Sequence, residues 1–158
     1  EIVNQRDFPG WGTLMNEGVF KENWRGEHAM MPSLGGPVGA WFYRAILGIR
    51  PDPSGPGFQR IIIKPEMVGG LSWAKGSYDS VRGRISSSWE RHGDAFKLRV
   101  EIPVNTSATV YLPAAEAAIR ESGRHLGSAS GVRLLRREEG RAVLAVGSGR
   151  YEFESQLK

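Results

Sequence analysis

The chain has 158 residues, no cysteine, 40% hydrophobic residues and a formal net charge of +4. This length corresponds to one ordinary domain, or to a small domain with part of another, and the hydrophobic fraction is well above that of disordered chains. The missing cysteines exclude disulfides and thiolate metal sites. No run approaches the ~20 apolar residues that span a membrane. Glutamates are interspersed among the arginines of the last third, which is typical of a solvated surface and disfavours a nucleic-acid partner.

Residues 1–50 form one compositional unit that is rich in aromatic residues and glycine. The N-terminus lacks the basic and apolar regions of a signal peptide and starts in mid-pattern, so we expect the chain to be part of a longer protein. Within this unit residues 37–48 are predicted to be a helix, because Pro37 suits a first helical turn and Gly48 suits the position after the last one. The apolar stripe of this helix consists of Val38, Trp41, Phe42, Ala45 and Ile46.

This stripe must pack against something, because one or two helices with aromatic faces cannot bury themselves. We therefore predict that residues 1–50 are the last piece of a larger helical domain. In isolation the stripe would pack on the domain that follows or on another copy of the chain. Since exposed apolar patches drive association, we expect the isolated chain to self-associate through residues 38–48.

Residues 51–58 are predicted to be a linker, because prolines and glycines interrupt regular structure there. From residue 59 onwards the polarity alternates or nearly alternates, as it does in half-buried strands. The predicted strands cover residues 60–64, 71–78, 83–91, 95–102, 107–112, 118–121, 132–138, 141–146 and 150–156. Short strands between regular turn signals predict an antiparallel β-sandwich of Greek-key or jelly-roll type over residues 59–158.

The residues offer few catalytic constellations, since there is no nucleophile elbow, no phosphate-binding loop and no HExxH motif. The three histidines lie far apart in sequence, and neither a metal nor a cofactor is predicted. Glu22 differs in its surroundings, because it lies between Phe20 and Trp24 and near Trp11. Sugar-cleaving sites combine aromatic rings with carboxylates that transfer protons. An aromatic core with a solvent-facing glutamate gives the same pattern, so both interpretations stay open.

A series of motifs runs in order through about residues 3–113. The first are Asn-Gln-Arg-Asp-Phe-Pro-Gly-Trp-Gly at 4–12, Glu-Gly at 17–18, Glu-Asn-Trp at 22–24, Trp-Phe-Tyr-Arg at 41–44 and Leu-Gly-Ile at 47–49. The later ones are Arg-Pro-Asp-Pro at 50–53, Pro-Gly-Phe at 56–58, Ile-Ile-Ile-Lys-Pro at 61–65, Trp-Ala-Lys-Gly-Ser-Tyr-Asp-Ser at 73–80, Asn-Thr at 105–106 and Ala-Thr-Val-Tyr-Leu-Pro at 108–113. In this order they resemble the C-terminal end of bacterial α-L-rhamnosidases, glycoside hydrolase family 78.

The resemblance implies that residues 1–50 are the tail of an (α/α)6 catalytic barrel and that a C-terminal β-sandwich follows. It implies an enzyme that hydrolyses terminal α-L-rhamnose from glycosides with inversion, in which one carboxylic acid protonates the leaving oxygen and a second carboxylate activates water. Glu22 stands at the position of the family's base, and the family's acid lies far upstream. The implied substrate-binding residues are Trp11, Trp24 and His28, although a loop histidine facing water is the alternative for His28.

For the strands after residue 59 the sequence leaves two roles open. A carbohydrate-binding module would hold a glycan through Trp73, Tyr78 or Trp89, whereas a structural sandwich would cover the end of the barrel and bind nothing. Aromatic residues on strands usually belong to a core, so we expect the structural role. Exposed and coplanar rings would favour the carbohydrate-binding module instead.

Overall fold

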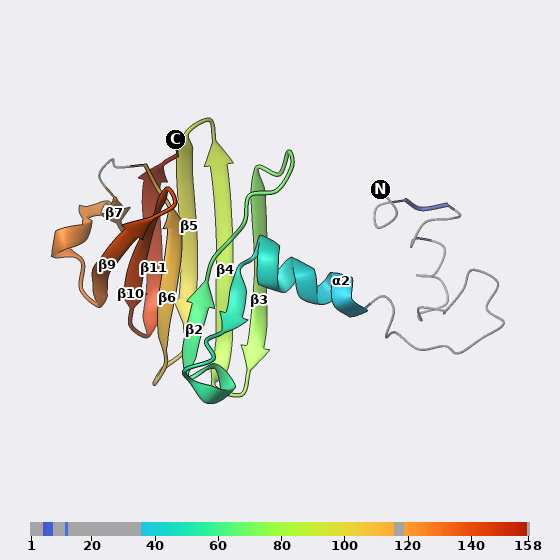
Figure 1. Cartoon of the computed structure of the whole chain (residues 1–158), viewed down its shortest axis with the longest axis horizontal. Helices are drawn as coiled ribbons and strands as arrows, with labels where there is room; N and C mark the ends of the chain where they lie inside the picture. Colours follow the sequence, from blue (N-terminus) through green and yellow to red (C-terminus); the bar gives the residue numbers. More distant parts are fainter. Residues whose placement is uncertain (1–4, 8–11, 13–35, 116–118, 158) are drawn as a thin grey trace. The chain divides into compact units, whose positions relative to one another are not determined.

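A computed structural model describes residues 5–7, 12, 36–115 and 119–157 of the chain. The chain forms two compact units, Glu1–Trp41 and Phe42–Lys158. In the first unit the described helix is α2 (Gly36–Trp41). The second unit is a β-sandwich whose two sheets face each other across a single core (Figure 1). None of the helices in the described ranges is long and apolar enough to cross a membrane.

Over the described residues one sheet has five strands, in the order β1-β2-β6-β10-β9. Their bounds are β1 (Ile49–Pro51), β2 (Arg60–Ile63), β6 (Ser107–Pro113), β9 (Val132–Glu138) and β10 (Arg141–Val146). The other sheet has six strands, in the order β3-β4-β5-β11-β7-β8. Their bounds are β3 (Trp73–Ser80), β4 (Gly83–His92), β5 (Ala95–Ile102), β7 (Arg120–Glu121), β8 (Arg124–His125) and β11 (Gly149–Gln156). Three short turns complete the unit: η2 (Phe42–Ile46), η3 (Pro56–Phe58) and η4 (Leu126–Ser128).

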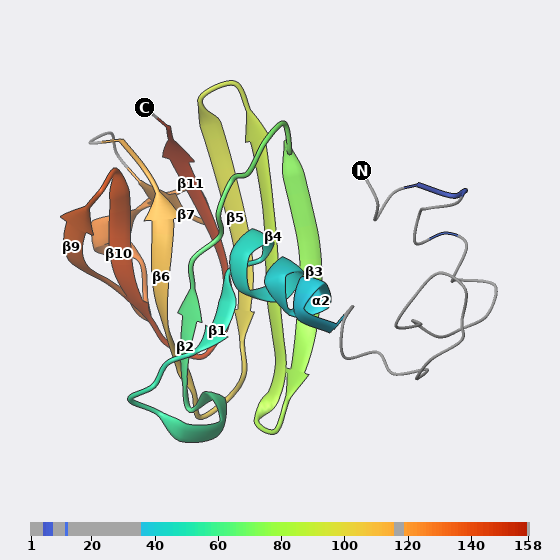
Figure 2. The ribbon, with the colours of Figure 1, turned by 45° about the vertical axis from the view of Figure 1, so that its right-hand side comes forward.

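The predicted β-sandwich is confirmed, but one of its strand pairs is parallel. Strand β2 runs parallel to β6, with Ile61 opposite Ala108 and Ile63 opposite Val110. The chain leaves β2, builds β3, β4 and β5 in the other sheet, and returns as β6 beside β2 (Figure 2). A parallel neighbour always needs such a crossover, so this pairing ties together segments that are far apart in sequence.

The core follows from the alternation of polar and apolar side chains along the strands. In β5 the inward residues Phe96, Leu98, Val100 and Ile102 are all buried, whereas Lys97, Arg99 and Glu101 between them point outward. The largest fully buried side chains are Trp89, Phe96 and Phe153. The period of two therefore divides β5 into a core face and a charged face, as the sequence predicts.

Most predicted strands are confirmed, and those at 95–102, 132–138 and 141–146 have the predicted bounds. Strands β1 and β8 were not predicted. Each is only two or three residues long, so neither displays a period that sequence can reveal. Strand β1 pairs with β2 and places Ile49 in the core. The segment predicted as a linker, residues 51–58, thus begins in a strand and ends in the turn η3.

The predicted helix over residues 37–48 forms, but its second half is π-helical. After α2 the chain continues as the π-helical turn η2, and the amide of Leu47 donates a hydrogen bond of 3.0 Å to the carbonyl of Phe42, five residues earlier. Ile46 and Leu47 are both buried in the sandwich core. The wider turn lets two consecutive residues enter the core. Gly48 then ends the helix in the left-handed conformation, at φ +75°.

We predict that Gly48→Ala destabilises the sandwich far more than Gly69→Ala. Both glycines have positive φ, +75° and +57°, which costs an alanine about 1 kcal/mol. A Cβ on Gly69 meets nothing within 4 Å, whereas a Cβ on Gly48 would overlap the backbone of Lys64 and Pro65. The overlap should cost Gly48→Ala at least about 2 kcal/mol more, measured by urea unfolding. Equal losses would show that the backbone at residue 64 can move aside.

Candidate functional site

The end of the helical segment is fixed to the sandwich by side chains of β4. The last carbonyls of a helix have no partner within the helix. Here the indole N–H of Trp89 donates a 2.8 Å hydrogen bond to the carbonyl of Ile46, and the hydroxyl of Ser87 donates one of 2.8 Å to the carbonyl of Leu47. Both donors are buried, with 1% and 0% of their surfaces exposed. The two buried polar groups, the indole N–H of Trp89 and the hydroxyl of Ser87, thus bind the end of the helical segment to the sandwich.

Backbone amides complete the same attachment. The amide of Glu66 donates to the carbonyl of Ala45 at 2.9 Å, and the amide of Lys64 donates to that of Gly48 at 3.0 Å. The guanidinium of Arg50 reaches back to the carbonyl of Arg44 at 2.9 Å. Consequently each of the carbonyls from residue 44 to residue 48 accepts a hydrogen bond from a residue of the sandwich. We call this set of contacts, around residues 44–48, the junction.

The packing of Leu47 against β3 also holds the junction in place. Leu47 is 5% exposed and lies over Gly76 of β3, where an added Cβ would stand 2.5 Å from a methyl group of Leu47. Glycine at this position opens the space that the leucine fills, in the way that strand glycines often mark a close approach. The motif Trp-Ala-Lys-Gly-Ser-Tyr-Asp-Ser at 73–80 therefore contains a residue that serves the junction.

An aromatic cluster adjoins the junction. Tyr78 of β3 lies 5.0 Å from Phe58 and 6.1 Å from Tyr43 between ring centroids, the second pair edge to face. Tyr43 and Tyr78 remain 41% and 40% exposed. Val81 lies beside this cluster, because it is within contact distance of a Cβ placed on Gly57. The cluster is thus a half-covered apolar surface at the place where the chain enters the sandwich.

The aromatic residues considered for glycan binding do not form a platform. Trp89 is buried and points into the core. Tyr78 shares the inner face of its strand with Gly76, because its register partner is the buried Ile85. Trp73 is an odd number of residues away from Tyr78, so it lies on the opposite face of β3, where it is 66% exposed. Trp89 therefore lies in the core, Tyr78 in the aromatic cluster beside the junction and Trp73 on the outer face of the sheet.

The outer face of the six-stranded sheet is a ladder of ion pairs. Arg99 contacts Glu152 at 2.6 Å and Glu90 at 3.1 Å, and Lys97 contacts Glu152 at 3.2 Å and Glu154 at 2.9 Å. The hydrogen bond from Arg99, together with that from Lys97, lowers the pKa of Glu152 below its usual value, although burial opposes the shift. Exposed pairs of this kind contribute little each. They neutralise the face rather than creating a charged patch.

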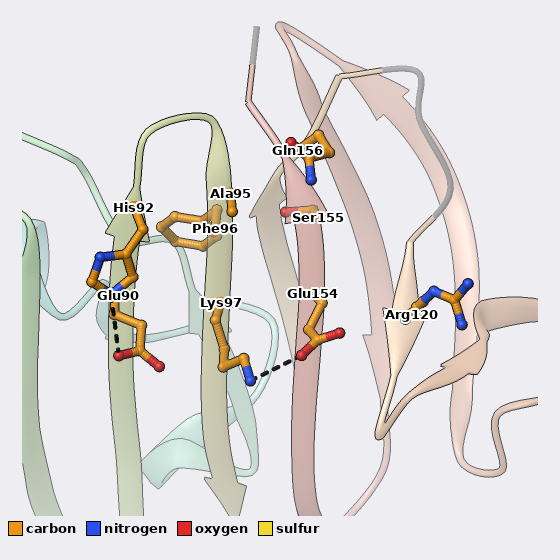
Figure 3. A pocket seen from close by; sticks show the side chains of 9 residues that line it. All are labelled: Glu90, His92, Ala95, Phe96, Lys97, Arg120, Glu154, Ser155 and Gln156. Atoms are coloured by element: carbon orange, nitrogen blue, oxygen red, sulfur yellow. Dashed lines mark ion pairs between the residues drawn. The ribbon is translucent and has the colours of Figure 1, made fainter.

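A shallow hollow of about 470 Å³ opens at one end of this ladder (Figure 3). Its lining residues are Glu90, His92, Ala95, Phe96, Lys97, Arg120, Glu154, Ser155 and Gln156. Lys97 is held by Glu154, and His92 lies 3.9 Å from Glu90 (Figure 3). Across the described ranges no three His, Asp or Glu side chains come close enough together to hold a metal ion. The lining contains the ion pair of Lys97 with Glu154, and its one phenyl ring, Phe96, is buried, so the hollow presents no exposed Trp, Tyr or Phe ring on which a sugar could stack.

The predicted catalytic residue Glu22 and the predicted substrate-binding residues Trp11, Trp24 and His28 lie outside the described residues. What sequence reasoning missed is the junction. The sequence alone indicates a core or glycan-binding role for Trp89 and no role for Ser87. One feature of the sequence could have indicated the junction: Ser87 and Trp89 occupy inward-facing positions of a predicted strand. Their polar atoms would be buried there and would need hydrogen-bond partners.

Comparison with known proteins identifies the fold. Residues 48–127, which begin in the junction and include most of both sheets, match the family model for the bacterial alpha-L-rhamnosidase C-terminal domain. The chain belongs to this family. The match extends beyond residue 113, where the motifs recognised in the sequence end. The family model describes the C-terminal domain of these proteins, and the residues that match it lie in the sandwich.

Relatives of this family match nearly the whole chain. An alpha-L-rhamnosidase of Streptomyces avermitilis is 30% identical over 96% of the chain, which spans 15% of that protein. The structure of an alpha-L-rhamnosidase from Dictyoglumus thermophilum matches with a TM-score of 0.70 and 30% identity over 99% of the chain and 18% of its own. The Streptomyces avermitilis alpha-L-rhamnosidase complexed with L-rhamnose matches with a TM-score of 0.71 and 28% identity, over 97% of the chain and 15% of its own.

We predict that Trp89→Phe destabilises the sandwich by about 1–3 kcal/mol, because it leaves the buried carbonyl of Ile46 without a donor. The matched control is Trp73→Phe, since Trp73 is 66% exposed and its substitution should change the free energy of unfolding by less than about 0.5 kcal/mol. Urea unfolding followed by circular dichroism measures both. If the two variants were equally stable, the junction would not depend on the indole N–H.

Proposed function

We propose that this chain is the C-terminal part of an inverting α-L-rhamnosidase that hydrolyses terminal α-L-rhamnose from glycosides. The observation that carries the proposal is the match of residues 48–127 to the C-terminal domain of such enzymes, joined by relatives of that name over nearly the whole chain. The chain spans only 15–18% of the length of these relatives. The proposed partners are therefore a rhamnose-containing glycoside and the rest of a catalytic barrel, to which residues 1–50 contribute the tail.

The proposed chemistry places the general base at Glu22. A carboxylate in that role removes a proton from the attacking water, and the aromatic residues Trp11 and Trp24 with His28 bind the sugar. The general acid is proposed to lie in the upstream part of the barrel. Two carboxyl groups ~6.5–9.5 Å apart leave room for the water that inversion requires. The support for these roles is the order of the motifs at 4–12, 17–18 and 22–24.

For residues 59–158 we propose a structural role. The junction supports this role, because the sandwich uses two buried polar side chains, Ser87 and Trp89, to hold the end of the helical segment. The half-exposed cluster of Tyr43, Phe58 and Tyr78 beside the junction is a surface on which a preceding domain can pack. The alternative, a carbohydrate-binding module, finds less support, because Trp73, Tyr78 and Trp89 do not share a face.

We predict that the isolated 158-residue chain does not hydrolyse an aryl α-L-rhamnoside. Its sandwich provides no proposed catalytic group, and one carboxylate without an acid partner is not an inverting site. The measurement is release of the aryl alcohol by purified chain against the buffer rate, with circular dichroism to verify folding. Turnover above the buffer rate would contradict the assignment of the acid to the upstream barrel.

A second prediction concerns Glu22→Gln in the full-length enzyme. It should lower kcat by about 10²–10⁴-fold or more and leave substrate binding largely intact, because the loss is of proton transfer in the transition state. The matched controls are Glu17→Gln and Glu27→Gln, which remove neighbouring carboxylates. If Glu22→Gln stayed within about threefold of the parent while one control collapsed, the base would be that other residue.

A further inference from the structure

Among the described residues, strand β3 pairs with β4 on one side and with no strand on the other, so it is an edge of the six-stranded sheet (Figure 2). On one side it pairs with β4 without any shift of register, from Trp73 opposite Glu90 to Ser80 opposite Gly83. It contains no proline and no bulge, which are the usual devices that block an edge. The devices of this kind that it does contain are two charged residues, Lys75 and Asp79. An eight-residue regular edge of this kind is suited to pairing with another strand.

One contact shows which residues of β3 direct their backbone groups to the free edge. The amide of Arg91 donates to the carbonyl of Ser72 at 2.7 Å, so the even-numbered residues of this segment turn their backbone N–H and C=O groups towards β4. The alternate residues turn theirs to the free edge; they are Trp73, Lys75, Ser77 and Asp79. Within the described part of the chain these four residues make no backbone hydrogen bond at that edge.

The side chains of the same four residues lie on the outer face of the sheet. At the N-terminal end of this row Trp73 is 66% exposed. The row continues with one cation, Lys75, then the polar Ser77 and one anion, Asp79. Asp79 contacts Arg84 of its own chain at 2.8 Å, yet its side chain remains 71% exposed. From Trp73 to Asp79 the row is thus apolar, positive, polar and negative.

The part of this row from Lys75 through Ser77 to Asp79 is complementary to itself when it is reversed. We propose that two copies of the chain pair through β3, antiparallel, about a twofold axis at Ser77. Lys75 then lies opposite the partner's Asp79, and this pair occurs twice. A closed twofold contact of this kind uses the same patch on both copies.

Neighbouring registers are less favourable. In an antiparallel pair, two directly opposite residues either both form the cross-strand hydrogen bonds or both do not. The twofold axis of such a pair can therefore pass through a residue of β3 but not between two residues. An axis at Gly76 would place Trp73 opposite the partner's Asp79 and leave Lys75 opposite a serine. An axis at Lys75 would place two lysines opposite each other, and like charges directly opposite are destabilising. An axis at Tyr78 would place Asp79 opposite a serine and Lys75 opposite the partner's hairpin turn. Of these registers, the one with its axis at Ser77 pairs Lys75 with Asp79.

The test is sedimentation equilibrium of the full 158-residue chain and its charge-reversal variants. We expect a concentration-dependent dimer for the parent. K75D and D79K should each weaken dimerisation at least about tenfold, because each turns two attractive cross-strand pairs into repulsive ones. An equimolar mixture of K75D and D79K should dimerise again, since the new carboxylates of one chain face the new ammonium groups of the other. The double variant K75D/D79K should also recover.

The matched control is R150E, a charge reversal on the same outer face but on β11, at an exposed pair with Glu101. It should leave dimerisation unchanged, and circular dichroism should show all variants folded. A parent that stays monomeric, single variants that dimerise like the parent, or a mixture that fails to recover would each overturn the proposal. Association through residues 38–48 would respond to none of these reversals, so it would be recognised. None of these outcomes depends on rhamnosidase activity.

Discussion

The hydrogen bond from the buried indole of Trp89 to the carbonyl of Ile46 is the contact on which the arrangement of this chain rests. A helix that ends against an apolar core leaves carbonyls that water cannot reach, and each costs free energy unless a donor is supplied. The sandwich supplies donors from β4 and from the segment after β2. Gly76 is small so that Leu47 can approach, and Gly48 turns the chain away immediately afterwards.

Alternation of polarity predicted most strands and the class of fold, because a period of two needs only neighbouring residues to be visible. The junction was not predictable in this way. Ser87 and Trp89 act on carbonyls about 40 residues earlier, and the sequence does not record which buried donor meets which acceptor. Nor did it reveal the π-helical turn, since the apolar stripe of residues 38–46 fits a regular α-helix equally well. The prediction that Glu22 is the general base depends on the resemblance in motif order, because the residues around Glu22 by themselves also fit an aromatic core.

The two tryptophans of the β3–β4 hairpin illustrate how strand parity decides the role of a residue. Trp89 shares the inner face with Ile85 and is covered on all sides, whereas Trp73 lies opposite Glu90 on the outer face and is open to solvent. The same residue type serves the core in one case and an edge surface in the other. An inventory of aromatic residues without this parity would count both as glycan contacts.

The parallel pairing of β2 with β6 has a consequence for how the protein is made. Residues 60–63 cannot find their neighbour until residues 107–110 exist, and the donors that hold residue 46 arrive only with residue 89. Contacts between such distant segments require closure of long loops and slow the folding of β proteins. During synthesis from the N-terminus, whatever precedes residue 42 must therefore wait, with its C-terminal end unsecured, until most of the sandwich has left the ribosome.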